Sequence, residues 1–233
     1  METGNNSGSM NMAIDEYLMT HVTDTPIFRI YGWSNPCVSI GYFQSISDID
    51  FQKCRIEAVD VVRRVTGGGS VFHEKELTYS FVSRKYPSKI LDSYQEICQI
   101  IVSGLKTLGI DAKFSPLNDI TVDGKKIGGN AQTRKNGILL QHGTILLEVN
   151  KEKMFSLLRV PAEKISDKKI SDAKYRVSQI SKTFDQVAKS LKDSLKLVFG
   201  CQTVPTKLKQ SELESCKKIA KDKYSNPDWT LKR

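Results

Sequence analysis

The sequence predicts an α+β fold in which mixed β-sheets are flanked by helices. Short runs rich in β-branched and aromatic residues, separated by Gly, Pro and Asn, recur over residues 27–149 and are typical of strands. Beyond residue 151 the chain becomes rich in Lys, and its apolar residues recur at helical spacing. With 233 residues and 39% hydrophobic residues, the chain is long enough to bury a core, and a single domain over 1–233 is expected.

The first part of the chain is predicted to begin with a helix. Ser9 is its expected N-cap, because Met10, Ile14 and Leu18 follow at helical spacing. Turn residues at 33–36 then separate two strands over 27–31 and 38–43. A short helix over 48–58 is followed by three strands over 61–65, 71–73 and 77–82.

An amphipathic helix is predicted over 94–108, because Ile97, Ile101 and Leu105 form one apolar stripe and Gly109 ends it. Strands are expected over 110–114, 120–122, 126–127 and 138–149, and Asp123-Gly124 gives the strongest hairpin prediction in the chain. Helices are expected near 154–158, 184–199 and 213–224. Residues 166–175 are predicted to form a mobile loop.

Composition excludes several kinds of protein. No apolar run approaches the ~18 residues that a membrane span needs, and the N-terminal residues lack the basic start and apolar stretch of a signal peptide. The cysteines are odd in number and scattered, which favours reduced core thiols and a cytoplasmic protein. They are Cys37, Cys54, Cys98, Cys201 and Cys216.

The net charge of +9 is unevenly distributed. Residues 1–120 carry 11 basic and 14 acidic side chains, a net charge of −3, and residues 121–233 carry 24 and 12, a net charge of +12. A basic half favours an acidic partner, or serves only solubility. Because the chain has no basic motif interleaved with aromatic residues, we expect no nucleic-acid partner, and we expect no membrane partner either.

A glycine-rich segment follows the strand predicted over 61–65. It reads Arg63-Arg64-Val65-Thr66-Gly67-Gly68-Gly69-Ser70-Val71-Phe72-His73. Adjacent glycines cost conformational entropy, and one reason to keep them is close approach of backbone N–H groups to a phosphate or carboxylate. Arginines beside the loop would supply bidentate donors to the same anion, and strand alternation favours Arg64 over Arg63 for this role. An ordinary glycine-rich turn with two solvated arginines is the alternative.

Two further segments carry polar residues among apolar ones. In the first, Lys126 precedes Gly128-Gly129, where a point charge would stabilise a phosphate or a developing oxyanion; the alternative is a solvated hairpin lysine. In the second, Gln141-His142-Gly143-Thr144 interrupts an apolar strand, and His142 is either a core histidine or one that faces a ligand.

Four well-known sites are disfavoured. The three histidines lie far apart and there is no Cys-x-x-Cys pair, so a zinc site is not expected. The chain has no Gly-x-Ser-x-Gly elbow. It also has no dinucleotide-binding or Walker glycine motif.

Taken together, the motifs resemble the lipoate–protein ligase A family, within the wider group of biotin and lipoate ligases and octanoyltransferases. The matches are Arg-Arg-x-Thr-Gly-Gly-Gly-Ser-Val-Phe-His (63–73), Asn118-Asp119, Gly-Lys-Lys-Ile-x-Gly-x-Ala (124–131) and Gln-His-Gly-Thr-Ile-Leu-Leu (141–147). Gly41-Tyr42-Phe43-Gln44 and the opening Asn11-Met12-Ala13-Ile14-Asp15-Glu16 match as well. The resemblance spans nearly the whole chain, in the same order, and implies a biotin/lipoate ligase-like catalytic domain.

The resemblance implies an ATP-dependent lipoate–protein ligase. Such an enzyme condenses lipoate or octanoate with ATP and Mg²⁺ to an acyl-adenylate, which a lysine of an acceptor protein then attacks. Lys126 would be the catalytic cation, and Asp119 would hold Mg²⁺ with the nucleotide. The residues implied to bind ATP and the lipoyl-adenylate are Arg64, Gly67, Gly68, Gly69, Val71, Phe72, His73, Asn118, Asp119, Gly129, Ala131, His142 and Gly143. Tyr79 joins Val71 and Phe72 as a candidate wall of the acyl slot.

The alternative within the same fold is an octanoyltransferase that takes octanoyl groups from acyl carrier protein or moves them between lipoyl domains. That chemistry needs a thiolate nucleophile. In one transferase branch the cysteine precedes the hairpin, where this chain has residues 113–117 without cysteine. In the other branch it follows a proline, where this chain has Pro161-Ala162. Both positions are empty, which favours the ligase.

The resemblance also implies the protein partners. The acceptor would be a lipoyl domain of a 2-oxo acid dehydrogenase complex or the glycine-cleavage H protein. Many ligases of the family carry a further C-terminal domain, and the chain resembles split members without it. A separate small accessory subunit is therefore expected.

Overall fold

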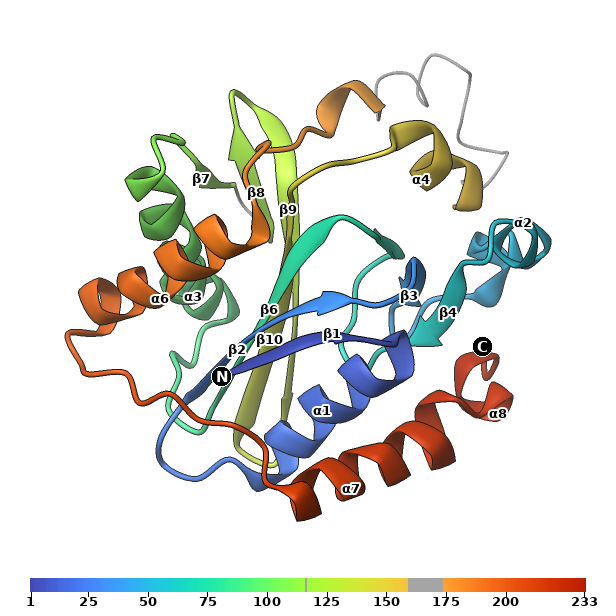
Figure 1. Ribbon diagram of the computed structural model, residues 1–233, viewed down its shortest axis with the longest axis horizontal. Helices are drawn as coiled ribbons and strands as arrows, with labels where there is room; N and C mark the ends of the chain where they lie inside the picture. Colours follow the sequence, from blue (N-terminus) through green and yellow to red (C-terminus); the bar gives the residue numbers. More distant parts are fainter. Residues whose placement is uncertain (116, 159–173) are drawn as a thin grey trace.

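The computed structural model describes residues 1–115, 117–158 and 174–233, and it contains two β-sheets (Figure 1). The larger sheet has the strand order β1-β2-β6-β10-β9-β8-β7, and the smaller has the order β4-β3-β5. Strands β1 and β2 pair in parallel, as do β3 and β4, while the other pairs are antiparallel. Both sheets are therefore mixed, and the predicted α+β class is confirmed.

The bounds of the elements follow the chain. The larger sheet contains β1 (Glu2–Asn6), β2 (Ile27–Trp33), β6 (Glu76–Ser83), β7 (Lys113–Ser115), β8 (Asp119–Val122), β9 (Lys125–Lys135) and β10 (Ile138–Leu146). The smaller contains β3 (Cys37–Ile40), β4 (Asp60–Arg63) and β5 (Val71–His73). The α-helices are α1 (Gly8–His21), α2 (Phe51–Ile56), α3 (Ile90–Thr107), α4 (Lys151–Leu157), α6 (Phe184–Phe199), α7 (Gln210–Ile219) and α8 (Pro227–Thr230). A 3₁₀ turn covers Ile46–Asp48, and a π-helical turn covers Ala220–Tyr224.

Helices cover both faces of the larger sheet because its central strands are apolar on both sides. On β10, Leu139 and Ile145 pack with helices α3 and α6, whereas Ile138 and Leu140 pack with α1 and Cys216 of α7. Alternate side chains of a strand point to opposite faces, so one continuous apolar run serves two cores. Figure 1 shows α3 and α6 on one side of the sheet and α1 and α7 on the other.

Several predicted elements have different ends in the structure. Helix α1 is capped by Ser7, whose side chain accepts the N–H of Met10, and not by Ser9. The helix predicted over 48–58 is divided, because Asp50 caps a new helix after the 3₁₀ turn. The predicted strand over 126–127 is part of the much longer β9, and the short elements β1 and α8 were not predicted.

Other predictions are confirmed. Helix α6 begins at Phe184 after a Thr183–Gln186 capping box and ends before Gly200, which has a φ of +60°. The hairpin between β8 and β9 turns at Asp123 and Gly124, both with positive φ. The predicted mobile loop over 166–175 lies almost wholly outside the described residues, and so does Pro161-Ala162. Among the described helices, none is both long enough and apolar enough to cross a membrane.

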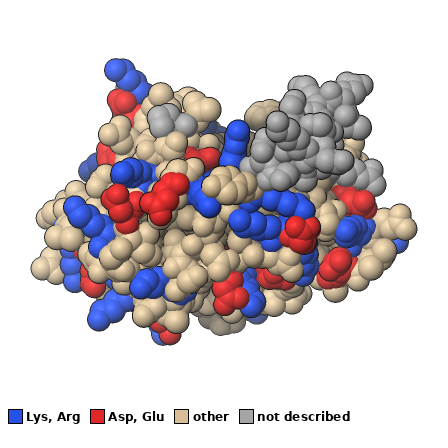
Figure 2. All heavy atoms as spheres, turned by 90° about the horizontal axis from the view of Figure 1, so that it is seen from above, with Lys and Arg blue, Asp and Glu red and all other residues tan. Residues whose placement is uncertain are grey.

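The basic second half of the chain is partly neutralised by acidic residues of the first half. Lys153 pairs with Glu74 at 2.7 Å, and Lys223 pairs with Glu16 at the same distance. Figure 2 shows positive and negative side chains interspersed over one face of the molecule, with a group of positive ones near its centre. The folded surface on this face is therefore less uniformly basic than the charge count of residues 121–233 suggests.

Candidate active site

A cavity of about 160 Å³ lies between the two sheets. The smaller sheet contributes Ser39 and His73, the glycine-rich loop contributes Gly68 to Val71, and the larger sheet contributes residues of β2, β6, β9 and β10. Of the residues predicted from the sequence, the cavity is lined by Arg64, Gly68, Gly69, Val71, His73, Asn118, Lys126, Gly129, Ala131, His142 and Gly143. The structure thus brings together segments that are widely separated along the chain.

Four predicted residues do not line this cavity. Phe72 lies on the opposite face of β5 from Val71 and His73 and packs in a core cluster. Gly67 borders a neighbouring groove instead, and Tyr79 is fully buried with its hydroxyl on Asn130. Asp119 reaches the site only through its ion pair with Lys126. The alternation of strands β5 and β6 explains why Phe72 and Tyr79 are poor candidates for an acyl wall.

Lys126 extends from the β8–β9 hairpin to the rim of the cavity. Its Nζ lies 2.7 Å from Oδ1 of Asp119, and its side chain is 43% exposed. A Cβ on Gly129 would come within 3.0 Å of that Nζ, so the glycine leaves the space through which the lysine passes. The site therefore presents an ammonium group that is partly exposed and is oriented by its ion pair with Asp119.

Arg64 shapes the glycine-rich loop. Its guanidinium donates to the carbonyl oxygens of Gly67 and Gly69 at 2.6 and 2.7 Å, and to that of Ser39 at 2.9 Å. Burial lowers the pKa of Arg64 to about 10, so the group stays charged at neutral pH. Gly68, between the two bonded carbonyls, has a φ of +87°. Arg64 was predicted to offer its donors to a ligand anion. In the structure it holds the glycine-rich loop instead, and most of its N–H donors already have partners.

Arg63 serves the other side of its strand. It is fully buried and donates to the carbonyl oxygens of Gly41, Gln44 and Thr230. In return, Nε1 of Trp229 donates to the carbonyl oxygen of Arg63 at 2.7 Å. Arg63 is therefore neither a solvated arginine nor a donor to an anion in the cavity, the two roles that the sequence allowed. It connects strand β4 to helix α8.

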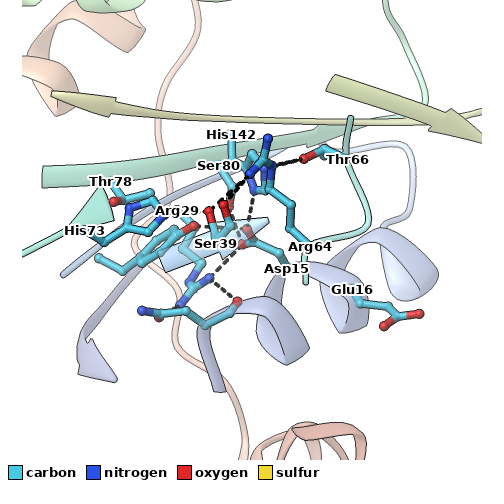
Figure 3. Close-up of polar contacts among 12 residues, drawn as sticks. Asp15, Glu16, Arg29, Ser39, Arg64, Thr66, His73, Thr78, Ser80 and His142 are labelled. Atoms are coloured by element: carbon cyan, nitrogen blue, oxygen red, sulfur yellow. Dashed lines mark hydrogen bonds and ion pairs between the residues drawn. The ribbon is translucent and has the colours of Figure 1, made fainter. Parts of the chain in front are cut away.

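A buried polar cluster lies beneath the cavity and was not predicted (Figure 3). Asp15 of α1 pairs with Arg29 of β2 at 2.6 Å, accepts from Ser80, and lies 3.1 Å from Nδ1 of His142. Burial opposes ionisation of Asp15, but Arg29 and the hydrogen bonds outweigh it, so the pKa of this carboxyl lies below its ordinary value. The sequence carries a signal for this pair: Asp15 lies within the apolar pattern 12–18, and Arg29 lies within the apolar pattern 27–31.

Burial lowers the pKa of His142, against the opposing effect of Asp15. Nε2 of His142 lies 2.7 Å from the Thr66 hydroxyl, so both ring nitrogens have partners. His142 also borders the cavity, and it is thus both a core histidine and a cavity residue, the two interpretations that its sequence context allowed.

No cysteine lies among the described residues that line the cavity. Burial raises the pKa of Cys37 far above its ordinary value, that of Cys98 to about 12, and those of Cys54 and Cys216 to about 11. These four thiols are core residues, as predicted. Cys201 is exposed just beyond α6, so the prediction was wrong there. None of the four buried thiols is set up as a thiolate nucleophile.

The described residues contain no group of three or more His, Cys, Asp or Glu side chains placed to hold a metal ion. Asp119 is a single carboxylate that already pairs with Lys126. The assignment of Mg²⁺ to Asp119 therefore stays a prediction.

Comparison with known proteins identifies the family. The model of the lipoyl protein ligase A/B catalytic domain matches residues 7–198. The chain belongs to this family. Octanoyltransferase LipM of Bacillus subtilis (strain 168) is 32% identical, over 100% of this chain and 97% of the relative. Octanoyltransferase LipM of Kyrpidia tusciae is 35% identical, over 83% and 77% of the two chains.

Solved members of the lipoyl protein ligase A/B family share the fold. A chain from the archaeal lipoylation system of Thermoplasma acidophilum, a bipartite lipoate protein ligase and its E2 lipoyl domain, is 27% identical with a TM-score of 0.90, over 99% of this chain and 94% of that one. A lipoate–protein ligase A bound with ATP is 25% identical with a TM-score of 0.87, over 99% and 96%. The predicted ligase-like catalytic fold is thereby confirmed.

The comparisons correct the predicted activity. The sequence was expected to encode an ATP-dependent lipoate–protein ligase, because both family positions for a nucleophilic cysteine are empty. Relatives matched over the full length of the chain are named octanoyltransferases, so this expectation is wrong. What the comparisons support is an enzyme of the lipoate ligase and transferase family.

Proposed function

We propose that this chain is an acyltransferase that moves an octanoyl group from acyl carrier protein, or from another lipoyl domain, to a lysine of a lipoyl domain. The observation that carries the proposal is a cation at the rim of a cavity, in a chain whose full-length relatives are named octanoyltransferases. Met12, Val71 and Trp33 give the cavity apolar wall area beside that cation, which suits a fatty acyl chain next to a polar carbonyl.

Lys126 supplies the charge that acyl transfer requires. When a nucleophile attacks an acyl carbonyl, negative charge develops on the oxygen, and a positioned ammonium stabilises it. Asp119 directs the ammonium and leaves it accessible, since the two side chains are 43% and 35% exposed. The acceptor, a lipoyl domain or the glycine-cleavage H protein, brings the lysine that takes the acyl group.

A panel of donors tests the proposal. The chain is incubated with a lipoyl domain and with octanoyl–acyl carrier protein, an octanoylated second lipoyl domain, or octanoate or lipoate with ATP and Mg²⁺. The acceptor is then weighed by mass spectrometry. We expect a gain of one octanoyl group from a protein-bound donor without ATP. A gain that requires free acid and ATP would overturn the proposal.

The separate accessory subunit remains a prediction. Its support is the likeness to the bipartite ligase of Thermoplasma acidophilum. Purification of the tagged chain from its natural source tests it, and the absence of a second small protein would contradict it. Retention of a second small protein on the tagged chain, purified from its natural source, is the expected result.

A further inference from the structure

We propose that Ser39 is the nucleophile that accepts the acyl group, activated by His73 and oriented through Glu76. The inference rests on the proposed function, because it takes an acyl thioester as the substrate. It answers a question that the cavity raises: the relatives are named octanoyltransferases, yet no described cavity residue is a cysteine. A serine with a paired histidine and a carboxylate performs the same step.

The three side chains lie in the order that nucleophilic catalysis requires. The Ser39 hydroxyl lies 2.7 Å from Nε2 of His73, and Nδ1 of His73 lies 2.7 Å from Oε1 of Glu76. Strand register produces this order, because Ser39 pairs with Val71 in β3 and β5, and His73 is the next residue on the same face. Ser39 and His73 both line the cavity.

The neighbouring groups fix the direction of the protons. Oε1 of Glu76 accepts from Nδ1–H of His73, which leaves Nε2 to accept the proton of the Ser39 hydroxyl. The same carboxylate oxygen accepts from the Thr78 hydroxyl, which in turn accepts from Nε1 of Trp33. The indole of Trp33 also stacks on the ring of His73, with 3.9 Å between the centroids, and holds the imidazole in this orientation.

Arg64 completes the arrangement. One of its guanidinium nitrogens donates to Oγ of Ser39 at 3.2 Å and to the Ser39 carbonyl oxygen at 2.9 Å. A cation at that oxygen stabilises the negative charge that develops when the proton moves to His73. The buried arginine that holds the glycine-rich loop thus also contacts the attacking atom.

Two other hydroxyl groups near the cavity lack one of these features. Thr66 contacts His142, which contacts Asp15, in the same order, but Thr66 does not line the cavity. Ser70 lines the cavity, but its hydroxyl has no hydrogen-bond partner and therefore no base. Ser39, although only 1% exposed, both lines the cavity and contacts a histidine, and variants of the other two residues show whether either feature alone is enough.

The reaction balances in two steps. Oγ of Ser39 attacks the thioester carbonyl while His73 takes the hydroxyl proton; the C–S bond breaks, and His73 returns the proton to the leaving thiolate. The ε-amine of the acceptor lysine then attacks the resulting ester. A C–N bond forms, the C–O bond to Ser39 breaks, and the proton lost by the amine returns to Oγ through His73.

Two probes test the inference independently. An octyl fluorophosphonate reacts with activated serines and needs neither donor nor acceptor protein. Octanoyl–acyl carrier protein, quenched in acid without the lipoyl domain, traps the acyl-enzyme. In both cases peptide mass spectrometry locates the adduct in the wild type and in the Ser39→Ala, Ser39→Cys, Ser70→Ala and Thr66→Val variants.

We expect both adducts on Ser39 in the wild type, the Ser70→Ala variant and the Thr66→Val variant, and neither adduct in Ser39→Ala. Acyl transfer by Ser39→Ala should fall on the order of 10³-fold or more. Ser39→Cys should hold the octanoyl group as a thioester that hydroxylamine releases, which shows that the site still folds. Wild-type rates in Ser39→Ala, or an adduct on another residue, overturn the inference.

The outcomes separate this inference from the proposed function. Transfer to the lipoyl domain without any adduct on Ser39 retains the function and overturns the nucleophile. A fluorophosphonate adduct on Ser39 with no transfer from any protein-bound donor retains the nucleophile and overturns the function.

Discussion

Nζ of Lys126 lies 2.7 Å from Oδ1 of Asp119, and the two residues face each other across the irregular pairing of β8 and β9. Both side chains are more than one-third exposed, so solvent screens the pair and it contributes little to the free energy of unfolding. Its effect is directional, because it holds a flexible lysine beside Gly129 at the cavity rim.

Lys126→Ala should lower octanoyl transfer by about 10²–10³-fold, since it removes the donor to the developing oxyanion. The melting temperature should stay close to that of the wild type, because the side chain is only half-buried. Lys125→Ala is the matched control, as the neighbouring ammonium lies over the ring of Tyr175 and does not line the cavity. Near-normal transfer by Lys126→Ala would contradict the assigned role.

Asp15→Asn should lower the free energy of unfolding by about 3–5 kcal/mol, because it leaves the buried charge of Arg29 without its counterion. Glu16 offers the control. It points away from the cluster in Figure 3, and its partly buried carboxylate pairs with Lys223 and accepts from the Tyr224 hydroxyl, so Glu16→Gln should cost about 1–2 kcal/mol. Urea unfolding followed by circular dichroism measures both, and equal losses would contradict the assigned difference.

The stability of the fold should depend on pH through His142. Burial lowers the folded pKa of this histidine below 6.5, so the unfolded chain binds more protons between the two values. The free energy of unfolding should therefore be greatest above pH 6.5 and should fall as the pH drops from there through the folded pKa. Urea titrations of wild type and His142→Gln at several pH values measure this effect, and an unchanged slope in the variant would refute it.

The glycines of the loop should differ in their tolerance of a methyl group. Gly68→Ala is strained by the φ of +87° and would bring Cβ within 3.1 Å of Arg64, so we expect a loss of about 1 kcal/mol or more. Gly69→Ala meets no atom within 4 Å, and it should fold normally while narrowing the cavity that Gly69 lines. A rise in KM for the octanoyl donor with an unchanged melting temperature is the expected result for Gly69→Ala.

Alkylation of the native protein should distinguish thiol from hydroxyl chemistry. Iodoacetamide should modify Cys201, the exposed cysteine, and should spare the four buried thiols, whose pKa values are raised by burial. Transfer activity should survive the treatment, and peptide mapping identifies the modified site. Loss of activity together with modification of a buried cysteine would contradict the assignment.

Local patterns in the sequence predict much of the fold. The apolar run in β10 and the capping residues of α6 act over short distances, and these elements lie close to where they were expected. Strand β1 is short and polar and is held mainly by its pairing with β2, a long-range contact that local periodicity does not contain. For the same reason the extension of β9 to Lys135 was not predicted, since it depends on the register with β10.

The candidate site could be predicted only in part, because local patterns show some of its residues and long-range strand pairing brings in the others. The glycine-rich loop, Lys126 and His142 interrupt strong local patterns and are visible in the sequence. Ser39 and Trp33 look like ordinary strand residues, and they join the site only because β3 pairs with β5 and β2 pairs with β6. The ligase prediction rested on two positions without cysteine, and the names of the full-length relatives overturn it.

Arg63 and Arg64 are joined by one peptide bond, yet the first holds helix α8 and the second holds the glycine-rich loop and Oγ of Ser39. The end of strand β4 therefore contacts helix α8 through Arg63, and the next residue, Arg64, contacts the glycine-rich loop. Displacement of Trp229 would break its hydrogen bond to the carbonyl oxygen of Arg63, one residue away from the guanidinium that holds the glycine-rich loop.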